Sequence, residues 1–302
     1  MALQQSDMFL DGLRGELRRD ETMARHTSWR VGGPADYFYT PADKADLAQL
    51  LRQLPSAMPF YWVGLGSNLL VRDGGLRGMV IRSHKGLIRI ERVEEQGLYA
   101  ETGVTSAKVA RAAMQAGLAG AEFLAGIPGS FGGALAMNAG AFGGETWDLV
   151  RRAECVTRTG ELVWFDADAI ETGYRTVRLP PDHWFVAAEL ELEKAQESGG
   201  RARIRSLLER RGASQPVQSA NAGSVFRNPP GDHAARLLEA VGMKGAVIGD
   251  AEVSTLHANF IINRGAATAA DIEALIEEGR AVVADRFGVM LEPEVRIVGE
   301  PS

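Results

Sequence analysis

Residues 125–144 read AGIPGSFGGALAMNAGAFGG, a stretch without a charged residue in which glycine and alanine predominate. Glycine is used where the backbone turns sharply or comes close to another group, so side chains are withheld along this segment. Two explanations fit the pattern: a large flat ligand against the backbone, or a close helix-to-strand packing seam without a ligand. A bound cofactor is the more economical of the two.

A second glycine cluster, Gly64-Leu65-Gly66-Ser67-Asn68, follows the apolar run of residues 60–63. Glycines at the end of a strand let backbone N–H groups face an anion, and Ser67 and Asn68 add donors, which suits a pyrophosphate. The cluster is not a dinucleotide fingerprint, because no third glycine opens a helix, nor a phosphate-binding P-loop, because no Gly-Lys-Ser/Thr follows. Taken alone, a simple tight turn explains it as well.

A third segment, residues 219–229, reads SANAGSVFRNP. Ser224 follows a glycine turn and precedes an apolar pair, so it can present its hydroxyl to a ligand while Arg227 and Asn228 bind the ligand's polar parts. The segment is not the G-x-S-x-G nucleophile elbow. A purely structural turn is equally compatible with it.

The composition of the whole chain narrows the classes of function. The net charge of -6 over 302 residues gives no general attraction to nucleic acid or to anionic membranes. The single cysteine, Cys155, excludes an intramolecular disulfide and a cysteine-cluster metal site, and we expect it to lie buried in a strand. No apolar run reaches about 18 residues, and the first twenty residues are too charged for a signal peptide. We therefore expect a cytoplasmic protein without metal, membrane or nucleic-acid partners.

Start signals and periodicity predict several helices. Thr40 is the expected N-cap of a helix whose apolar face carries the leucines of residues 47–54, and a second helix spans about 106–116 and ends at Gly117. Thr268 with Asp271 is expected to cap a long C-terminal helix, and two more helices are expected around residues 204–208 and 237–241.

Short apolar runs between the helices predict strands at 60–63, 79–81, 98–101, 154–157, 162–165, 184–190, 260–262 and 295–298. Helices and strands do not alternate regularly, which favours an α+β fold over a doubly wound sheet or a (β/α)8 barrel. The polar stretch 196–200 is the expected domain boundary.

Six motifs in register make the chain from about Thr27 to Glu300 resemble the UDP-N-acetylenolpyruvoylglucosamine reductase family of bacterial cell-wall synthesis. They are Thr27-Ser28-Trp29-Arg30-Val31-Gly32-Gly33-Pro34-Ala35, Gly64-Leu65-Gly66-Ser67-Asn68-Leu69-Leu70, Gly126-Ile127-Pro128-Gly129-Ser130 with Asn138-Ala139-Gly140-Ala141, Tyr174-Arg175, Gly223-Ser224-Val225-Phe226-Arg227-Asn228-Pro229 and Glu292-Pro293-Glu294-Val295-Arg296.

The resemblance implies an FAD-binding fold of the vanillyl-alcohol oxidase type, with two α+β subdomains, plus an α+β substrate-binding domain. The corresponding ranges are 1–82 and 83–196 for the FAD subdomains, 201–288 for the substrate domain, and 289–302 for a C-terminal strand that returns to the flavin site. It implies non-covalent FAD held by Gly64, Leu65, Gly66, Ser67, Asn68, Leu69, Gly126, Ile127, Pro128, Gly129, Ser130, Gly133, Asn138, Ala139, Gly140 and Ala141.

The implied reaction is reduction of FAD by NADPH, followed by reduction of the enolpyruvyl double bond of UDP-N-acetylglucosamine enolpyruvate to a lactyl ether. Hydride leaves flavin N5 for the terminal carbon, and the resulting enolate must be stabilised, to which the cationic and bidentate Arg175 is suited. Ser224 matches the family's proton donor. Glu294 matches its catalytic acid, with an expected raised pKa, whereas Glu292 is the poorer match. Arg227, Asn228 and His257, with Lys244, are candidates for the diphosphate or uridine, although a solvated face explains each as well.

The family occurs with and without an extra loop that carries a tyrosine over the substrate. No tyrosine follows Tyr174, so the chain resembles the shorter form. Two rival functions stay open: an oxidase of the same fold with a tethered flavin, and a nucleotide-sugar sensor without chemistry. The absence of histidine from the glycine clusters disfavours the first, and the joint presence of Arg175, Ser224 and Glu294 disfavours the second.

Overall fold

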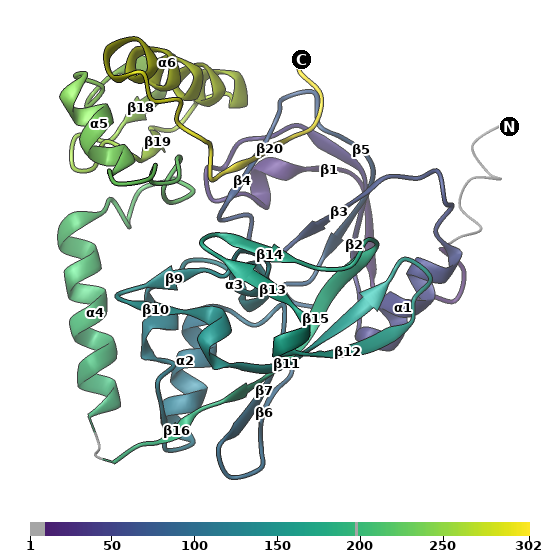
Figure 1. Ribbon diagram of the computed structural model, residues 1–302. Coiled ribbons are helices and arrows are strands. Elements are labelled where there is room, and N and C mark those ends of the chain that lie inside the picture. Colours follow the sequence, from purple (N-terminus) through teal and green to yellow (C-terminus); the bar gives the residue numbers. More distant parts are fainter. Residues whose placement is uncertain (1–9, 197–198) are drawn as a thin grey trace, which may run out of the picture. The chain divides into compact units, whose positions relative to one another are not determined.

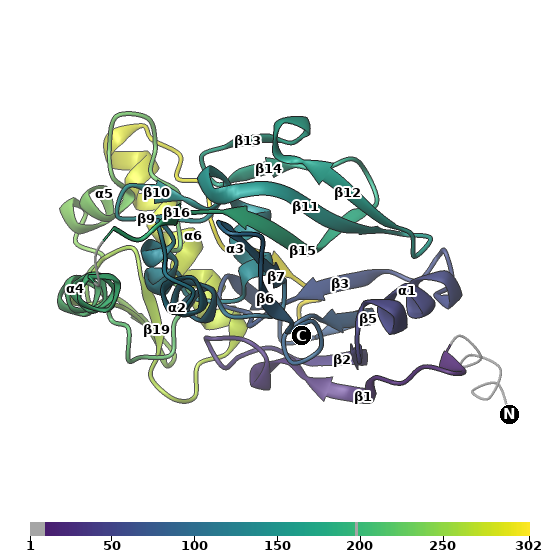
Figure 2. The same cartoon turned by 90° about the horizontal axis from the view of Figure 1, so that it is seen from below.

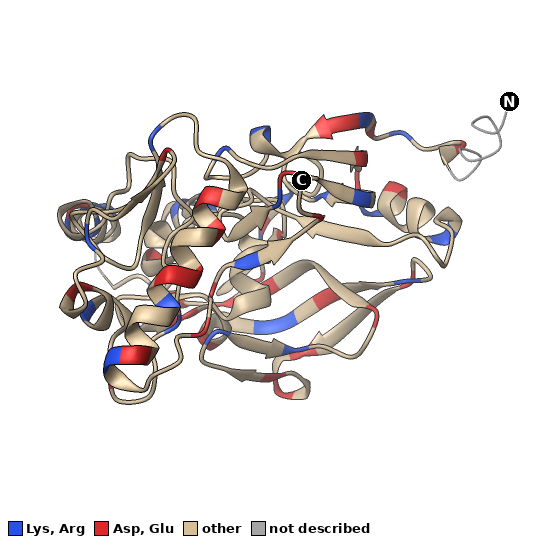
Figure 3. Ribbon diagram, turned by 90° about the horizontal axis from the view of Figure 1, so that it is seen from above, with Lys and Arg blue, Asp and Glu red and all other residues tan. Residues whose placement is uncertain are grey.

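The computed structural model describes residues 10–196 and 199–302, and its contacts divide the chain into two compact units. Unit 1 holds the described residues of Met1–Arg18, Tyr37–Gly64 and Gly78–Leu208. Unit 2 holds Arg19–Asp36, Leu65–Arg77 and Glu209–Ser302. Each unit thus collects segments that are far apart in the sequence. Acidic and basic residues are interspersed over the ribbon of both (Figure 3).

The helices of the described chain follow in sequence order (Figure 1). They are α1 (Lys44–Gln53), α2 (Ser106–Gln115), α3 (Phe131–Met137), α4 (Gly200–Ser214), α5 (Ala234–Ala240) and α6 (Ala269–Phe287), with 3-10 turns at Met23–Arg25, Glu122–Gly126, Thr146–Leu149 and Ala167–Ala169. No described helix combines the length and the apolar character that a membrane crossing requires.

The largest sheet is antiparallel and has the order β12-β11-β15-β7-β6, which can be followed in Figures 1 and 2. Its strands are β12 (Leu162–Asp166), β11 (Val150–Thr157), β15 (His183–Glu191), β7 (Gly97–Glu101) and β6 (Ile90–Val93). A four-stranded sheet has the order β1-β2-β5-β3, with β3 and β5 parallel. These strands are β1 (Glu16–Thr22), β2 (Pro34–Thr40), β5 (Leu76–Arg82) and β3 (Phe60–Val63).

Alternation along the five-stranded sheet gives unit 1 its main core. Leu98 and Ala100 of β7 join a buried cluster with Cys155 of β11 and with residues of α2 and α3, while Tyr99 and Glu101 face the other side. Cys155 is fully buried, and burial raises the pKa of its thiol to about 12. The expectation that Cys155 lies buried in a strand is therefore confirmed.

Unit 2 is built around α6, whose apolar face (Ile272, Leu275, Ile276) is fully buried. It contains the antiparallel sheet β17-β18-β19 and a parallel pair of β20 with β4. These strands are β17 (Val247–Ile248), β18 (Ala251–Val253), β19 (Ile261–Asn263), β20 (Arg296–Val298) and β4 (Leu69–Val71). The remaining short strands, all in unit 1, are β8 (Leu118–Ala119), β9 (Gly140–Ala141), β10 (Gly144–Glu145), β13 (Glu171–Gly173), β14 (Thr176–Arg178) and β16 (Glu193–Lys194).

The predicted helices and strands are all present, with shifts at their ends. The capping box of Thr268 and Asp271 is confirmed, but α1 begins three residues later than predicted, because Asp43 and not Thr40 caps it. Thr40 instead ends β2, which was not predicted. The strand β1 was also missed, because its sequence ELRRDET is polar and mostly exposed and lacks the apolar alternation of a half-buried strand. Residues 197 and 198 of the expected boundary lie outside the described residues.

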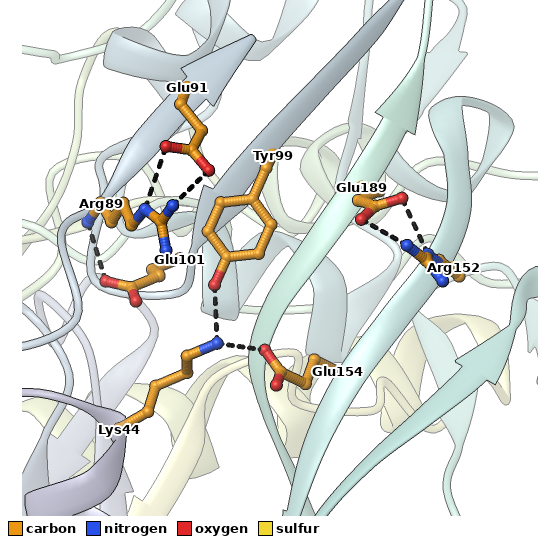
Figure 4. A network of polar contacts seen from close by, with 8 residues as sticks. All are labelled: Lys44, Arg89, Glu91, Tyr99, Glu101, Arg152, Glu154 and Glu189. Atoms are coloured by element: carbon orange, nitrogen blue, oxygen red, sulfur yellow. Dashed lines mark hydrogen bonds and ion pairs between the residues drawn. The ribbon is translucent and has the colours of Figure 1, made fainter. Parts of the chain in front are cut away.

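A polar network joins α1 to the face of the five-stranded sheet that is opposite the main core (Figure 4). Lys44 Nζ donates to Tyr99 Oη at 2.9 Å and to Glu154 Oε2 at 2.5 Å, and the Glu154 side chain is only 7% exposed. Burial alone lowers the pKa of Lys44, but the hydrogen bonds to Glu154 and Tyr99 outweigh it and raise the pKa above its ordinary value. Lys44 is therefore the cation that compensates a buried carboxylate.

We expect Lys44→Met to destabilise the protein by about 2–3 kcal/mol, because it leaves Glu154 buried without its cation. Chemical denaturation measures this, with Lys194→Met as the control. Lys194 pairs with Glu95 on the surface, so its loss should change stability by less than about 0.5 kcal/mol. A Lys44→Met variant no less stable than Lys194→Met would show that the network contributes nothing.

Glu101, in the same network, predicts a pH dependence. Burial raises the pKa of its carboxyl, although its Oε2 accepts a hydrogen bond from Arg89 N at 2.8 Å. The folded protein thus holds this proton more tightly than the unfolded chain, so stability is lost as pH rises from about 4.5 through the raised pKa. Glu101→Gln should remove this loss, and the stability gained over wild type should be larger at pH 8 than at pH 5. Denaturation at both values tests it, and a pH-independent difference would contradict it.

Candidate flavin and substrate site

The glycine- and alanine-rich segment, residues 125–144, begins at the end of the 3-10 turn Glu122–Gly126 and contains α3. Ser130 caps α3 through its Oγ, which accepts from Gly133 N at 3.4 Å, and Asn138 ends it in a left-handed conformation. Phe131 and Leu135 are fully buried and fix the helix to the core of unit 1. The segment is therefore a firmly held, side-chain-poor surface.

Packing explains some of its glycines. A Cβ added at Gly132 would lie 2.6 Å from Thr102 Cβ, and one added at Gly144 would lie 2.8 Å from the Phe123 ring. At Gly126 an added Cβ would meet the Phe142 ring at 2.7 Å. For these positions the packing-seam explanation is sufficient.

Packing does not explain Gly133. This residue is exposed, and an added Cβ would have only Ser130 Oγ within 4 Å, at 3.8 Å. Glycine inside a helix is less stable than alanine by about 0.5–1 kcal/mol, and contacts among the described residues give no reason for glycine at this position. The exposed face of α3 at Gly133 suits a flat group that lies against the backbone, which is how an isoalloxazine ring or a pyrophosphate approaches a protein.

The second predicted cofactor segment adjoins the first in unit 1. Gly64 follows β3, and a Cβ there would lie 2.0 Å from Ser130 Oγ. The rest of this motif lies in unit 2, where Gly66 has φ +63° and approaches the carbonyl of His26. Gly64 and Ser130 are thus brought together, as a shared cofactor site requires.

Asn138 holds the predicted site together through its side chain. Its Nδ2 donates to Glu145 Oε2 at 2.8 Å and to Gly173 O at 3.3 Å, while Oδ1 accepts from Trp147 N at 3.1 Å. The side chain is only 2% exposed. Asn138 therefore ties the end of α3 to the hairpin that presents Arg175.

Arg175 lies in the two-residue turn between β13 and β14, where Gly173 pairs with Thr176. Its backbone has φ +54°, an uncommon conformation for a residue with a side chain. Its Nη2 donates to Gly140 O at 3.3 Å, and the guanidinium lies 5.2 Å from the centroid of the Tyr174 ring. The cation is thus directed to the alanine- and glycine-rich segment, and Arg175 belongs to the same unit as Gly133.

Ser224 and Glu294 lie on adjacent segments of unit 2. Gly223, with φ +78°, precedes Ser224, and its N–H donates to Asn221 Oδ1 at 2.9 Å. Glu294 N donates to Val225 O at 2.7 Å, and Arg227 N donates to Glu292 O at 2.9 Å. The two predicted catalytic residues are therefore neighbours across a short backbone pairing, and both side chains are half-buried.

Asn68, predicted to bind the cofactor, also supports Glu294. Its Nδ2 donates to Glu294 O at 3.0 Å, and its own carbonyl accepts from Arg296 N at 3.0 Å. The end of the second glycine cluster is thereby linked to the strand β20, which pairs with β4. Sequence reasoning could not find this link, because 226 positions separate the two residues.

The candidates for substrate binding have distinct surroundings. Asn228 is exposed, and its Oδ1 accepts from Ala234 N at the start of α5, while Lys244 pairs with Glu239 at 2.8 Å. Burial lowers the pKa of His257, and its Nδ1 accepts from Asn259 N at 3.3 Å. A neutral ring with Nδ1 as acceptor carries its proton on Nε2, so His257 offers one N–H donor.

The described residues contain no group of three or more histidine, cysteine or acidic side chains able to hold a metal ion.

Asn259 was missed by the sequence analysis. It is 3% exposed, and its side chain forms hydrogen bonds with the backbone of Phe226, two residues after Ser224. Its only sequence signal was its place before a buried strand.

Comparison with known proteins decides the family. Residues 35–166 match the family model described as an FAD binding domain, and residues 215–298 match the C-terminal domain of UDP-N-acetylenolpyruvoylglucosamine reductase. The chain is 58% identical to the UDP-N-acetylenolpyruvoylglucosamine reductase of Methylococcus capsulatus, over 95% of this chain and 94% of that protein. The chain belongs to the UDP-N-acetylenolpyruvoylglucosamine reductase family.

Two further likenesses agree. The reductase of Alkalilimnicola ehrlichii is 58% identical over 95% of this chain and 96% of its own length. The crystal structure of the MurB reductase from Thermus caldophilus has a TM-score of 0.80 at 31% identity, covering 94% of this chain and 99% of that one. These matches confirm the predicted family, the α+β fold class with an FAD-binding fold, FAD as the cofactor and an oxidoreductase activity.

Proposed function

We propose that the protein reduces the enolpyruvyl group of UDP-N-acetylglucosamine enolpyruvate to the lactyl ether of UDP-N-acetylmuramate. NADPH is the reductant, and the reaction belongs to cytoplasmic peptidoglycan synthesis. The observation that carries the proposal is 58% identity, over nearly the whole length, to relatives named for this substrate. We further propose that ranges 1–82 and 83–196 are the two FAD-binding subdomains, that 201–288 is the substrate-binding domain, and that 289–302 is the C-terminal strand segment that returns to the flavin site.

When bound, FAD would supply the hydride chemistry that links NADPH to the enolpyruvyl group. The residues proposed to hold it are the two glycine-rich segments, residues 64–69 and 126–141. The bare face of α3 at Gly133 and the contact of Gly64 with Ser130 support this assignment. No histidine occurs in either segment, which supports non-covalent binding over a tethered flavin.

Arg175, Glu294 and Ser224 are proposed to act on the substrate. Arg175 is permanently cationic and binds the carboxylate on which negative charge develops as an enolate forms. Glu294, as a neutral acid, donates a hydrogen bond to the same charge. Ser224 donates its hydroxyl proton to the carbon that bears the ether oxygen. Arg227, Asn228 and His257 are proposed to bind the diphosphate or the uridine.

A product assay tests the function. Under anaerobic conditions the purified protein with FAD should oxidise NADPH beyond one equivalent per flavin only when the enolpyruvyl sugar is present, and proton NMR should show the vinyl signals of the substrate replaced by those of a lactyl group. NADPH oxidation that consumes oxygen without the sugar would instead identify an oxidase. The absence of any NADPH oxidation would favour the sensor.

Gly133 tests the proposed flavin position. Gly133→Leu should leave the apoprotein's thermal stability unchanged or higher, because the residue is exposed, its added Cβ meets no described atom closer than 3.8 Å, and leucine favours the helix. It should lower FAD affinity at least tenfold, because the side chain occupies the face assigned to the flavin. Gly132→Ala is the control, since its Cβ would overlap Thr102 and destabilise the apoprotein itself. Normal flavin binding by Gly133→Leu would remove α3 from the site.

A further inference from the structure

The segment that carries Ser224 is held from both sides in unit 2. Residues Val225 and Phe226, which follow the serine, are 1% and 3% exposed and join the buried cluster around α6. On one side Glu294 N donates to Val225 O at 2.7 Å. On the other side lies Asn259. The position of the Ser224 hydroxyl therefore depends on two separate backbone attachments.

Asn259 supplies the second attachment with its backbone and its side chain. Its carbonyl accepts from Val225 N at 2.9 Å. Its side-chain Oδ1 accepts from Phe226 N at 2.9 Å, and its Nδ2 donates to Phe226 O at 2.8 Å. The carboxamide thus satisfies both backbone polar groups of one buried residue, two positions after Ser224, as a neighbouring β-strand would.

The pairing needs a donor and an acceptor side by side in one side chain. An amide presents one acceptor and two donor hydrogens in a plane, whereas aspartate presents only acceptors when ionised and leucine presents neither. Asn259 and Phe226 are each only 3% exposed, so bulk water cannot replace the carboxamide as a partner. Removing either hydrogen bond therefore leaves a buried backbone group of Phe226 unsatisfied. The backbone at Phe226 would then shift to find other partners, and Ser224 would move with it.

We propose that Asn259 is a positioning residue for proton donation by Ser224. This inference rests on the proposed function, in which the Ser224 hydroxyl protonates the substrate carbon. Proton transfer demands hydrogen-bond reach between donor and acceptor, and a displacement of about 1 Å can slow an aligned reaction about a hundredfold. Asn259 acts through the backbone and not by touching the substrate.

The test separates the two half-reactions of the FAD-loaded protein by anaerobic stopped flow. Asn259→Asp keeps the side-chain volume and the acceptor, and at a pH at which the new carboxyl is ionised it loses the donor to Phe226 O. We expect flavin reduction by NADPH to stay within about twofold of wild type, because no proton from Ser224 is needed there. Flavin reoxidation by the enolpyruvyl sugar should slow about 10- to 100-fold. The solvent isotope effect on reoxidation should rise, because proton transfer becomes rate-limiting.

Asn263→Asp is the matched control. Asn263 is also buried in unit 2, donates from Nδ2 to Trp29 O at 2.8 Å and accepts at Oδ1 from Gly265 N at 2.8 Å. Its replacement should lower stability to a similar extent without slowing reoxidation more than about twofold. Equal slowing by both variants would show that Asn259 has only a structural role and would overturn the proposal.

A double-mutant cycle with Ser224→Ala separates this inference from the proposed function. If Asn259 acts through Ser224, then Asn259→Asp should slow reoxidation little further once the hydroxyl is gone. Fully additive slowing would refute the positioning role while leaving the serine's role intact. Normal reoxidation by Ser224→Ala alone would instead refute the proposed proton donor.

Discussion

Ser224→Ala should slow reoxidation of the reduced flavin by UDP-N-acetylglucosamine enolpyruvate about 10²- to 10⁴-fold, while NADPH reduces the flavin at close to the wild-type rate. The reason is that the reaction has two half-reactions and only the second one needs a proton from Ser224. Hydride transfer to the flavin requires no proton from the serine, whereas the substrate carbon that carries the ether oxygen must be protonated before the product forms. Single-turnover absorbance under anaerobic conditions measures the two steps separately.

Ser219→Ala is the control for this variant. Ser219 lies in the same segment, but its hydroxyl donates to Pro216 O at 2.8 Å and forms a local turn. Its loss should leave both half-reactions within about twofold of wild type. If Ser224→Ala reoxidised as fast as Ser219→Ala, the proton would have to come from another group or from water, and the role assigned to Ser224 would be wrong.

Arg175→Lys should slow reoxidation about 10²- to 10³-fold, the range expected when one stabilising group for a developing oxyanion is lost. Lysine keeps the positive charge but not the planar, bidentate geometry that matches a carboxylate. The left-handed backbone at Arg175 strains lysine to the same extent, so the comparison isolates the head group. Steady-state and single-turnover rates, with FAD content measured beside them, test this.

Arg178→Lys is the matched control in the same hairpin. Arg178 pairs with Glu171 at 3.0 Å, and both side chains are about 70% exposed. We expect that variant to behave as wild type, because an exposed pair contributes little. Similar rates for Arg175→Lys and Arg178→Lys would remove Arg175 from the substrate chemistry.

Local signals in the sequence were sufficient for most of the fold. The α6 capping box, the end of α2 at Gly117 and the strand that carries Cys155 depend on neighbouring residues, and the structure confirms them. The N-cap of α1 was predicted at Thr40 and lies at Asp43, because both side chains can accept the capping hydrogen bond. Thr40 is the last residue of the strand β2, which the sequence did not reveal. The edge strand β1 was not predicted, because too few of its side chains are buried to give an apolar alternation in the sequence.

The site was predictable as residue types but not as contacts. The sequence could not show that a Cβ at Gly132 would overlap Thr102, whereas a Cβ at the adjacent Gly133 would face open space. Nor could it show that Asn259 pairs with Phe226, 33 positions away, or that Asn68 holds Glu294. Such links arise from tertiary folding and leave no periodicity or spacing in the sequence. The family motifs indicate which residues we propose to react, while the structure shows which contacts hold those residues.

The proposed reaction is tested by an absorbance spectrum of the FAD-loaded protein, taken anaerobically before and after NADPH and again after the enolpyruvyl sugar. We expect a yellow protein that NADPH bleaches and that UDP-N-acetylglucosamine enolpyruvate alone then restores to the oxidised spectrum. A protein that is bleached but not recoloured by this sugar would contradict the proposed substrate. A protein that takes up no FAD would contradict the account as a whole.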